Sequence, residues 1–171
     1  MTWNIKGNKN KIIINDSVVK STEVRIIGDG NLVLFDKCRD VKGVKLIIVG
    51  DGCRVEIQKN VGIGGARIVC GGENKFVTIG ENSMLSDNVE LWASDGHSIY
   101  NAEKEIINNP GNIIIGENVW LGTGVKVLKN VSIGSGTVVG MSSVVTKCCE
   151  ADAVYVGNPA KKTREKITWA M

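Results

Sequence analysis

An aliphatic side chain recurs every six residues through the second half of this 171-residue sequence. The positions are Ile79, Leu85, Leu91, Ile115, Leu121, Val127, Ile133, Val139 and Val145. A small or β-branched residue precedes each of them by two places, and alternate residues of a strand point to the same side. A six-residue period does not stay on one face of a helix with about 3.6 residues per turn. The pattern therefore predicts short strands that wind into an all-β solenoid with a continuous interior stack.

The composition is typical of one ordered β domain that spans residues 1–171. Val and Ile together number 42 against 7 Leu, a bias that favours strands. The net charge of +3 is too small to indicate nucleic acid or an anionic membrane as a partner. The sequence shows no leader peptide and no apolar run near the roughly 20 residues that span a bilayer. We therefore expect a cytoplasmic protein without stable membrane insertion.

The repeat divides this single domain into regions. Residues 1–76 carry a looser form of it, which predicts irregular N-terminal coils. Residues 77–150 carry the regular coils, interrupted at 93–112 by a 20-residue segment with polar residues at the expected aliphatic positions. Residues 151–171 form a C-terminal tail. Because long ordered loops are commonly functional, the segment 93–112 is the first candidate for an active-site loop.

Two local features depart from the simple repeat. Arg67 falls on an interior position of the register, where a charge is costly, so we expect a slip that turns Ile68 or Val69 inward. In the tail, Asn158 is a good N-cap and is followed by proline, a favoured first helical residue. These two residues predict a short helix over 159–170 that covers the open end of the solenoid.

The cysteines and the single histidine limit metal chemistry. The five cysteines are odd in number and contain no C-x-x-C pair, so we expect reduced thiols with a structural role. They are Cys38, Cys53, Cys70, Cys148 and Cys149. A zinc enzyme on a β-helix needs three histidine ligands, and the chain has one histidine. No metal site is predicted.

That one histidine, His97, lies near the start of the long segment. Near neutral pH an imidazole is the side chain best suited to take a proton from a hydroxyl group. From the residues alone, a catalytic base and a merely exposed or structural histidine are both open interpretations.

Three stretches resemble the hexapeptide-repeat acyltransferases, and among them the acetyltransferases of sugars and polysaccharides. They are IGENVWLG at 115–122, VVGMSSVVTK at 138–147 and VGNPAK at 156–161. The similarity covers residues 77–165 well and residues 1–76 only in style. The resemblance implies a left-handed parallel β-helix, a homotrimer, and acyl transfer from acetyl-CoA at the subunit interfaces.

The resemblance also implies roles for particular residues. His97, in the sequence Asp95-Gly-His, matches the general base that activates the acceptor hydroxyl. Asp95 would orient the imidazole or contact the acceptor, although a plain turn with Gly96 is an equal alternative. Backbone N–H groups near Trp120 would stabilise the oxyanion, and packing on the solenoid exterior is the alternative role for Trp120.

Six further positions match the family's residues for coenzyme A: Thr123, Met141, Ser142, Thr146, Lys147 and Lys161. Met141 and Ser142 replace the more usual Ala-Gly pair, which is compatible with contacts made through the backbone. A basic cluster near the C-terminus would meet the phosphates of the cofactor. Its members are Lys147, Lys161, Lys162 and Arg164. A solvated charged surface is the alternative for that cluster.

The acceptor is left open by the sequence. A hydroxyl of a capsule, lipopolysaccharide or exopolysaccharide sugar is the first expectation, and O-acetylation the first reaction. N-acetylation of an amino sugar nucleotide, or acetylation of a small exogenous molecule, is the alternative. A non-enzymatic structural or carbohydrate-binding solenoid is the alternative of another class. The sequence names neither the length of the acyl chain nor what residues 1–76 recognise.

Overall fold

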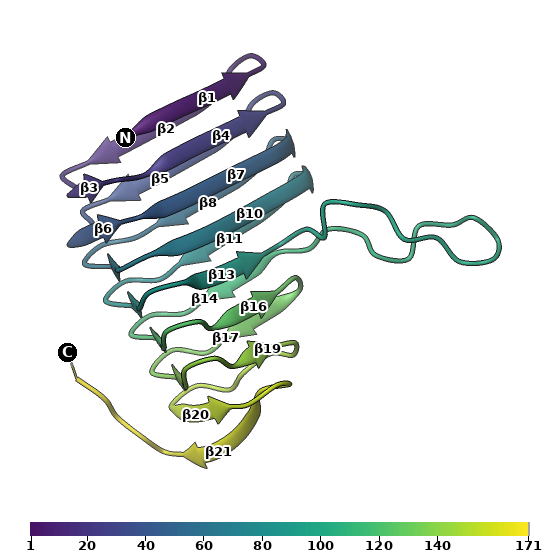
Figure 1. Cartoon of the computed structure of the whole chain (residues 1–171). Coiled ribbons are helices and arrows are strands. Elements are labelled where there is room, and N and C mark those ends of the chain that lie inside the picture. The colour runs from purple at the N-terminus through teal and green to yellow at the C-terminus, as the bar shows by residue number, and fades with distance from the viewer. Residues whose placement is uncertain (171) are drawn as a thin grey trace.

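The computed structural model describes residues 1–170 and shows an all-β solenoid with three faces, each a sheet of strands stacked coil upon coil (Figure 1). We call the faces A, B and C in the order in which the chain visits them. Face A contains β1 (Thr2–Lys6), β4 (Glu23–Ile27), β7 (Val44–Asp51), β10 (Ala66–Glu73), β13 (Val89–Trp92), β16 (Lys126–Leu128) and β19 (Val144–Val145). Face B contains β2 (Lys11–Asn15), β5 (Leu32–Asp36), β8 (Arg54–Ile57), β11 (Phe76–Ile79), β14 (Ile113–Ile115) and β17 (Val131–Ile133). Face C contains β3 (Val19–Lys20), β6 (Asp40–Lys42), β9 (Gly62–Ile63), β12 (Met84–Leu85), β15 (Trp120–Leu121), β18 (Val138–Val139), β20 (Ala153–Val156) and β21 (Lys161–Glu165).

The interior stack predicted from the six-residue period is confirmed. All nine repeat aliphatics from Ile79 to Val145 are at most 1% exposed, and so are the residues two places before them. Burial of one such aliphatic side chain is worth about 1.5–3 kcal/mol, so this column is the main source of the fold's stability. Three of the preceding residues are polar, and two of these hydroxyls donate to backbone carbonyls: Ser83 to Gly116 and Thr137 to Glu150.

The coils of the two halves differ in length. In the C-terminal half, Ile113 pairs with Val131, 18 residues later. In the N-terminal half, Val55 pairs with Val77, 22 residues later. The first coils were predicted to be irregular, but they stack in continuous parallel register from β1 to β10. Their additional residues lie largely on face A, where β7 and β10 each contain 8 residues.

A column of glycines makes the corner between faces A and B in these wide coils. Gly28 has a φ of 126°, and a Cβ atom there would lie 2.1 Å from the carbonyl oxygen of Gly50. Gly7 and Gly50 meet the next coil in the same way. Only glycine combines this backbone conformation with so close an approach between coils.

The expected register slip at Arg67 is confirmed. Ala66, Ile68 and Cys70 are the buried inward residues of β10, and Arg67 lies on the outer side, opposite Glu90 of β13. Ile68 is therefore the residue that turns inward, whereas Val69 lies on the outer side and is covered there.

The helix predicted over residues 159–170 is wrong. The segment Lys161–Glu165 forms β21, which pairs antiparallel with β20. Without it, β20 would leave a row of unpaired backbone groups at the end of face C. An N-cap is worth only about 1 kcal/mol, and β21 is exposed along its whole length, so a helix would bury little there. The strand does cover the edge of the solenoid, as expected of the tail.

Two further expectations concern the chain as a whole. All five cysteines are free thiols, and only Cys148 is exposed. Among residues 1–170, no helix has the length and apolar character needed to cross a membrane.

Candidate active site

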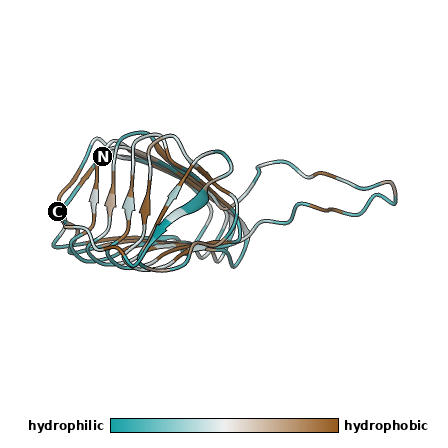
Figure 2. Cartoon of the chain, turned by 90° about the horizontal axis from the view of Figure 1, so that it is seen from below, coloured by the Kyte–Doolittle hydropathy of each residue, from teal (hydrophilic) through white to brown (hydrophobic). Residues whose placement is uncertain are grey.

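The segment 93–112 leaves the corner between faces A and B and projects from the solenoid as an arm (Figures 1 and 2). The arm is an ordered pair of chain segments. Tyr100 and Ile106 form an antiparallel bridge, and the amide of Ile107 donates to the carbonyl of Ile99 over 2.9 Å. These four side chains are 46–60% exposed. The arm therefore presents apolar surface at a distance from the core of its own chain.

Asp95, Asn108 and Lys129 hold the base of the arm. The Asp95 carboxylate forms an ion pair with Lys129 and accepts a hydrogen bond of 2.7 Å from the Asn108 amide. The same amide donates to the carbonyl oxygen of His97 over 2.8 Å. The hydrogen bond from Lys129 is the main cause that lowers the pKa of Asp95, and Asn108 adds to it. Asp95 thus fixes the backbone beside His97 instead of holding the imidazole.

His97 lies at the edge of a hollow of about 580 Å³ on the outer side of face A. Trp92, Arg67 and Arg25 line the same hollow from β13, β10 and β4. The imidazole is exposed, and it has no hydrogen-bond partner among residues 1–170. Both ring nitrogens are therefore accessible to a ligand that enters the hollow.

Trp120 lies on face C, on a different side of the solenoid from the hollow. The residue is 37% exposed, and its indole N–H donates to the Ser86 hydroxyl over 3.3 Å. The Trp169 ring packs on it with 5.8 Å between the ring centroids. The backbone N–H of Trp120 donates to the carbonyl of Thr137, so this particular amide is used within the solenoid. The predicted packing on the exterior is confirmed for the side chain.

Three of the predicted cofactor residues lie at the corner between faces C and A. Thr123 and Met141 line one shallow groove with Trp120, and the amide of Ser142 donates to the carbonyl of Thr123 over 2.8 Å. Met141 is 71% exposed. In the antiparallel register of β20 and β21, Lys161 lies opposite Val156 at the C-terminal end of face C. This corner thus presents backbone, apolar surface and a cation in succession.

Thr146 and Lys147 are not part of that corner. They follow β19 and lie at the corner between faces A and B, the corner from which the arm leaves. Of the basic cluster predicted near the C-terminus, Lys162 is engaged by Glu150 at 2.8 Å and by Glu165 at 3.4 Å. The Glu150 carboxylate is the main cause that raises the pKa of Lys162. Lys161 is the better cation for a phosphate.

Within one chain, the candidate residues therefore form two separate groups. One group lies at the corner between faces A and B, where the arm leaves: His97, Thr146 and Lys147. The other group lies on face C and at the corner between faces C and A: Trp120, Thr123, Met141, Ser142 and Lys161. Sequence reasoning missed the clamp by Asn108 and Lys129, and it missed Trp169. The six-residue period carries no signal for these residues, because they lie in the arm, at a corner and in the tail.

Comparison with known proteins identifies the class. Residues 112–147 match the family model described as bacterial transferase hexapeptide (six repeats). The chain is 33% identical to the chloramphenicol acetyltransferase of Klebsiella aerogenes over 105 residues, which cover 57% of this chain and 48% of that protein. The chain spans about half the length of the first curated relatives that it matches, 43% and 48%.

Two solved structures match nearly the whole chain. The polySia specific acetyltransferase NeuO superposes with a TM-score of 0.78 at 30% identity, over 99% of this chain and 83% of that chain. The polysialic acid O-acetyltransferase OatWY superposes with a TM-score of 0.79 at 30% identity, over 99% of this chain and 91% of that chain. The protein belongs to the hexapeptide-repeat acyltransferases, and its fold is the left-handed β-helix of that family.

Proposed function

We propose that this chain transfers an acetyl group from acetyl-CoA to a hydroxyl group of a sugar in a capsule, lipopolysaccharide or exopolysaccharide. The observation that carries the proposal is the position of His97. The one histidine of the chain lies at the edge of an open hollow, on a clamped loop, with its imidazole unoccupied by residues 1–170. We place the reaction in the cytoplasm, where acetyl-CoA is available.

His97 acts as the general base. Its neutral imidazole takes the proton of the acceptor hydroxyl while the oxygen attacks the thioester carbonyl. The tetrahedral intermediate then collapses, the C–S bond breaks, and the imidazolium returns a proton so that coenzyme A leaves as the thiol. Asp95, Asn108 and Lys129 position the histidine backbone during both proton transfers. The oxyanion is stabilised by backbone N–H groups of the corner near Trp120 other than the amide of Trp120 itself.

The donor lies along the corner between faces C and A. Thr123, Met141 and Ser142 contact the pantetheine arm, chiefly through the backbone, and Lys161 meets a phosphate. Thr146 and Lys147 lie across face A from this corner, so they serve a donor molecule that is held by another chain.

The site is completed by a second copy of the chain, in a homotrimer. The arm carries Ile99, Tyr100, Ile106 and Ile107 away from the core of its own chain, and such exposed apolar surface typically contacts a partner. The two groups of candidate residues also lie on opposite sides of face A. A closed ring brings the arm corner of one chain against the cofactor corner of the next.

A second acceptor class is supported by one relative. The similarity to chloramphenicol acetyltransferase makes a small exogenous hydroxyl compound an alternative to a polysaccharide. N-acetylation of an amino sugar nucleotide is the remaining alternative acceptor.

The test is release of free coenzyme A thiol from acetyl-CoA, measured against polysaccharides, simple sugars, amino sugar nucleotides and chloramphenicol. We expect the fastest release with a polysaccharide that carries free hydroxyl groups, and an O-acetyl ester in the product by NMR. Fastest release with chloramphenicol or with an amino sugar nucleotide would replace the proposed acceptor. No release with any acceptor, together with no binding of coenzyme A by calorimetry, would favour a non-enzymatic solenoid.

A further inference from the structure

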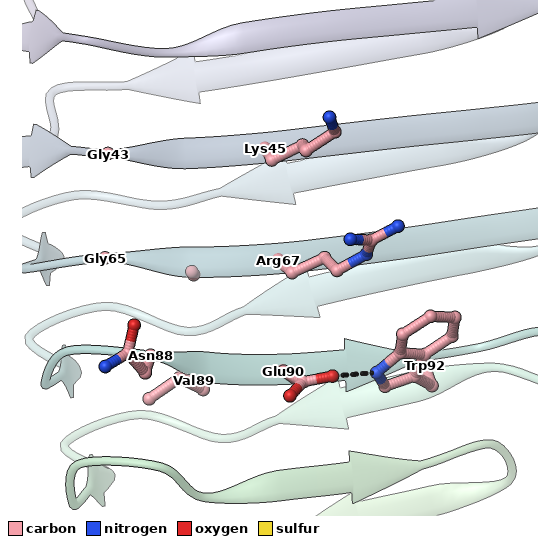
Figure 3. A pocket seen from close by; sticks show the side chains of 9 residues that line it. Gly43, Lys45, Gly65, Arg67, Asn88, Val89, Glu90 and Trp92 are labelled. Atoms are coloured by element: carbon pink, nitrogen blue, oxygen red, sulfur yellow. Dashed lines mark hydrogen bonds between the residues drawn. The ribbon is translucent and has the colours of Figure 1, made fainter.

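A second hollow, of about 440 Å³, lies on face A beside the one that contains His97. Figure 3 shows its side chains, with Lys45, Arg67 and Trp92 on the neighbouring strands β7, β10 and β13. Arg67 and Trp92 line both hollows. The two hollows therefore adjoin on the outer side of face A, and His97 lines the larger one. We call the two hollows together the groove.

The groove floor is apolar between its charged residues. Strand register places Arg25, Ile47, Val69 and Trp92 in one outward column across β4, β7, β10 and β13. Trp92 is held in place, because its indole N–H donates to the Glu90 carboxylate over 2.7 Å. The fixed indole ring and the side chains of Ile47 and Val69 give the middle of this column an apolar surface.

The charge of the groove is uneven. Lys45 is paired with Glu23 at 3.3 Å, Glu90 with Lys126, and Asp95 with Lys129. Within residues 1–170, neither Arg25 nor Arg67 forms an ion pair with a carboxylate, although Glu90 acts on Arg67 at longer range. The Arg67 guanidinium lies over the Trp92 ring, 5.3 Å from its centroid. The groove therefore contains two positive groups whose hydrogen-bond donors are open to a ligand.

From this groove we infer that the acceptor is an acidic polysaccharide whose sugar units carry carboxylates, an inference that rests on the acetyl transfer proposed above. The polymer lies along face A beside Trp92 and the guanidinium that covers its ring, and its carboxylates pair with Arg67 and Arg25. The planar guanidinium binds a carboxylate through two parallel hydrogen bonds, which neither a hydroxyl nor an amide can replace.

The spacing suits an extended ligand. Strands β4 and β10 are two places apart on face A, and Arg67 lies two residues before Val69, the register partner of Arg25 on β10. The backbones of Arg25 and Arg67 are therefore separated by about 12 Å. The two guanidinium groups thus bind different points along a chain. The proposal also accounts for the register slip at Arg67, since the slip turns this cation from the interior to the groove.

The experiment uses polysialic acid and alginate, each compared with its carboxyl-reduced, neutral form. For the parent protein we expect kcat/KM, from coenzyme A thiol release, to be at least about 10-fold higher with the acidic form, as a charge-assisted hydrogen bond is worth this much. Arg67→Gln and Arg25→Gln should each raise KM for the acidic polymer about 10-fold or more and leave KM for the neutral polymer unchanged. Lys59→Gln removes an exposed cation outside the groove and should change neither.

A binding measurement tests the groove independently of acetyl transfer. Calorimetry without acetyl-CoA should show that the acidic polymers bind to the parent and that their affinity falls in both arginine variants. Binding without acetyl transfer would support the groove and count against the proposed function. Equal transfer to the acidic and neutral forms, or an unchanged KM in Arg67→Gln, would overturn the groove and leave acetyl transfer standing. No binding of either acidic polymer would also overturn it.

Discussion

The wide coils of residues 1–76 and the narrow coils of residues 113–156 share one interior and differ in the width of one face. Both bury aliphatic side chains at alternate strand positions, to 0–1% exposure in most coils. On face A, however, β7 and β10 contain 8 residues, whereas β16 and β19 contain 3 and 2. The comparison teaches that interior packing sets the fold, while strand length sets how much outer surface is available for a ligand.

In the proposed reaction, the wide and the narrow coils bind different substrates. The wide coils present the groove with Arg25 and Arg67, and the narrow coils present the corner with Thr123 and Met141. The arm with His97 leaves the chain where the wide coils give way to the narrow ones (Figure 1). Substitutions in the wide coils should therefore change KM for the acceptor, and substitutions in the narrow coils should change the affinity for the donor.

The largest effect is expected at the junction. His97→Asn should lower kcat by about 10²–10⁴, the usual contribution of a positioned general base. Because His97 is exposed on the arm, the melting temperature and the affinity for coenzyme A should remain those of the parent. Thiol release, thermal unfolding and calorimetry are the measurements. A variant that retains more than about a tenth of the parent turnover would contradict the assignment.

The next effect tests the corners of the wide coils. Gly28→Ala should destabilise the protein by roughly 3–5 kcal/mol, because the new Cβ would lie 2.1 Å from the Gly50 carbonyl oxygen. Gly30→Ala is the matched control. It has a positive φ of 66° but open space around it, so only the left-handed conformation costs energy, about 1–2 kcal/mol. Urea unfolding compares the two variants. Equal losses of unfolding free energy in the two variants would mean that the close approach between coils at Gly28 adds nothing to the cost of the substitution.

The smallest effect is expected in the C-terminal part of the chain, on the affinity for coenzyme A. Lys161→Ala should lower the affinity for coenzyme A about 10-fold, as expected for the loss of a charge-assisted phosphate contact, and leave KM for the acceptor unchanged. The loss should shrink with dephospho-coenzyme A if the 3′-phosphate is the partner. Lys59→Ala serves as the control for the loss of one exposed charge. A change confined to the acceptor KM would contradict the division between the two halves.

Sequence reasoning predicted what depends on periodicity. The interior residues from Val77 to Val145 were predicted position by position. The slip at Arg67 was predicted with either Ile68 or Val69 turned inward, and the structure turns Ile68 inward. Periodicity could do this because a buried stack requires an apolar residue at each inward position. It also places Trp120 on the outside of face C.

The parts that the sequence did not predict depend on contacts between distant segments. The tail strand β21 forms because β20 offers an unpaired edge, which the local signal of Asn158 and Pro159 does not reveal. The clamp on Asp95 joins residues 34 positions apart, and the contact of Trp169 with Asn118 spans 51 positions. The regular stacking of the first coils was missed because their repeat of 21 or 22 residues is not a multiple of six.

The central claim is that the arm of one chain and the cofactor corner of another form one site. Two variants separate the halves: His97→Asn removes the base, and Thr123→Trp fills the groove beside Trp120. Each variant alone should be inactive while still assembling into trimers by light scattering.

Equal amounts of the two variants, unfolded and refolded together, provide the direct measurement. If each site combines two chains of a ring, about a quarter of the sites pair an intact His97 with an open corner, so the mixture should regain about a quarter of the parent turnover. If both halves of a site come from the same chain, every site carries one of the two changes. A refolded mixture that stays as inactive as the separate variants, or a parent that is monomeric by light scattering, would contradict the account.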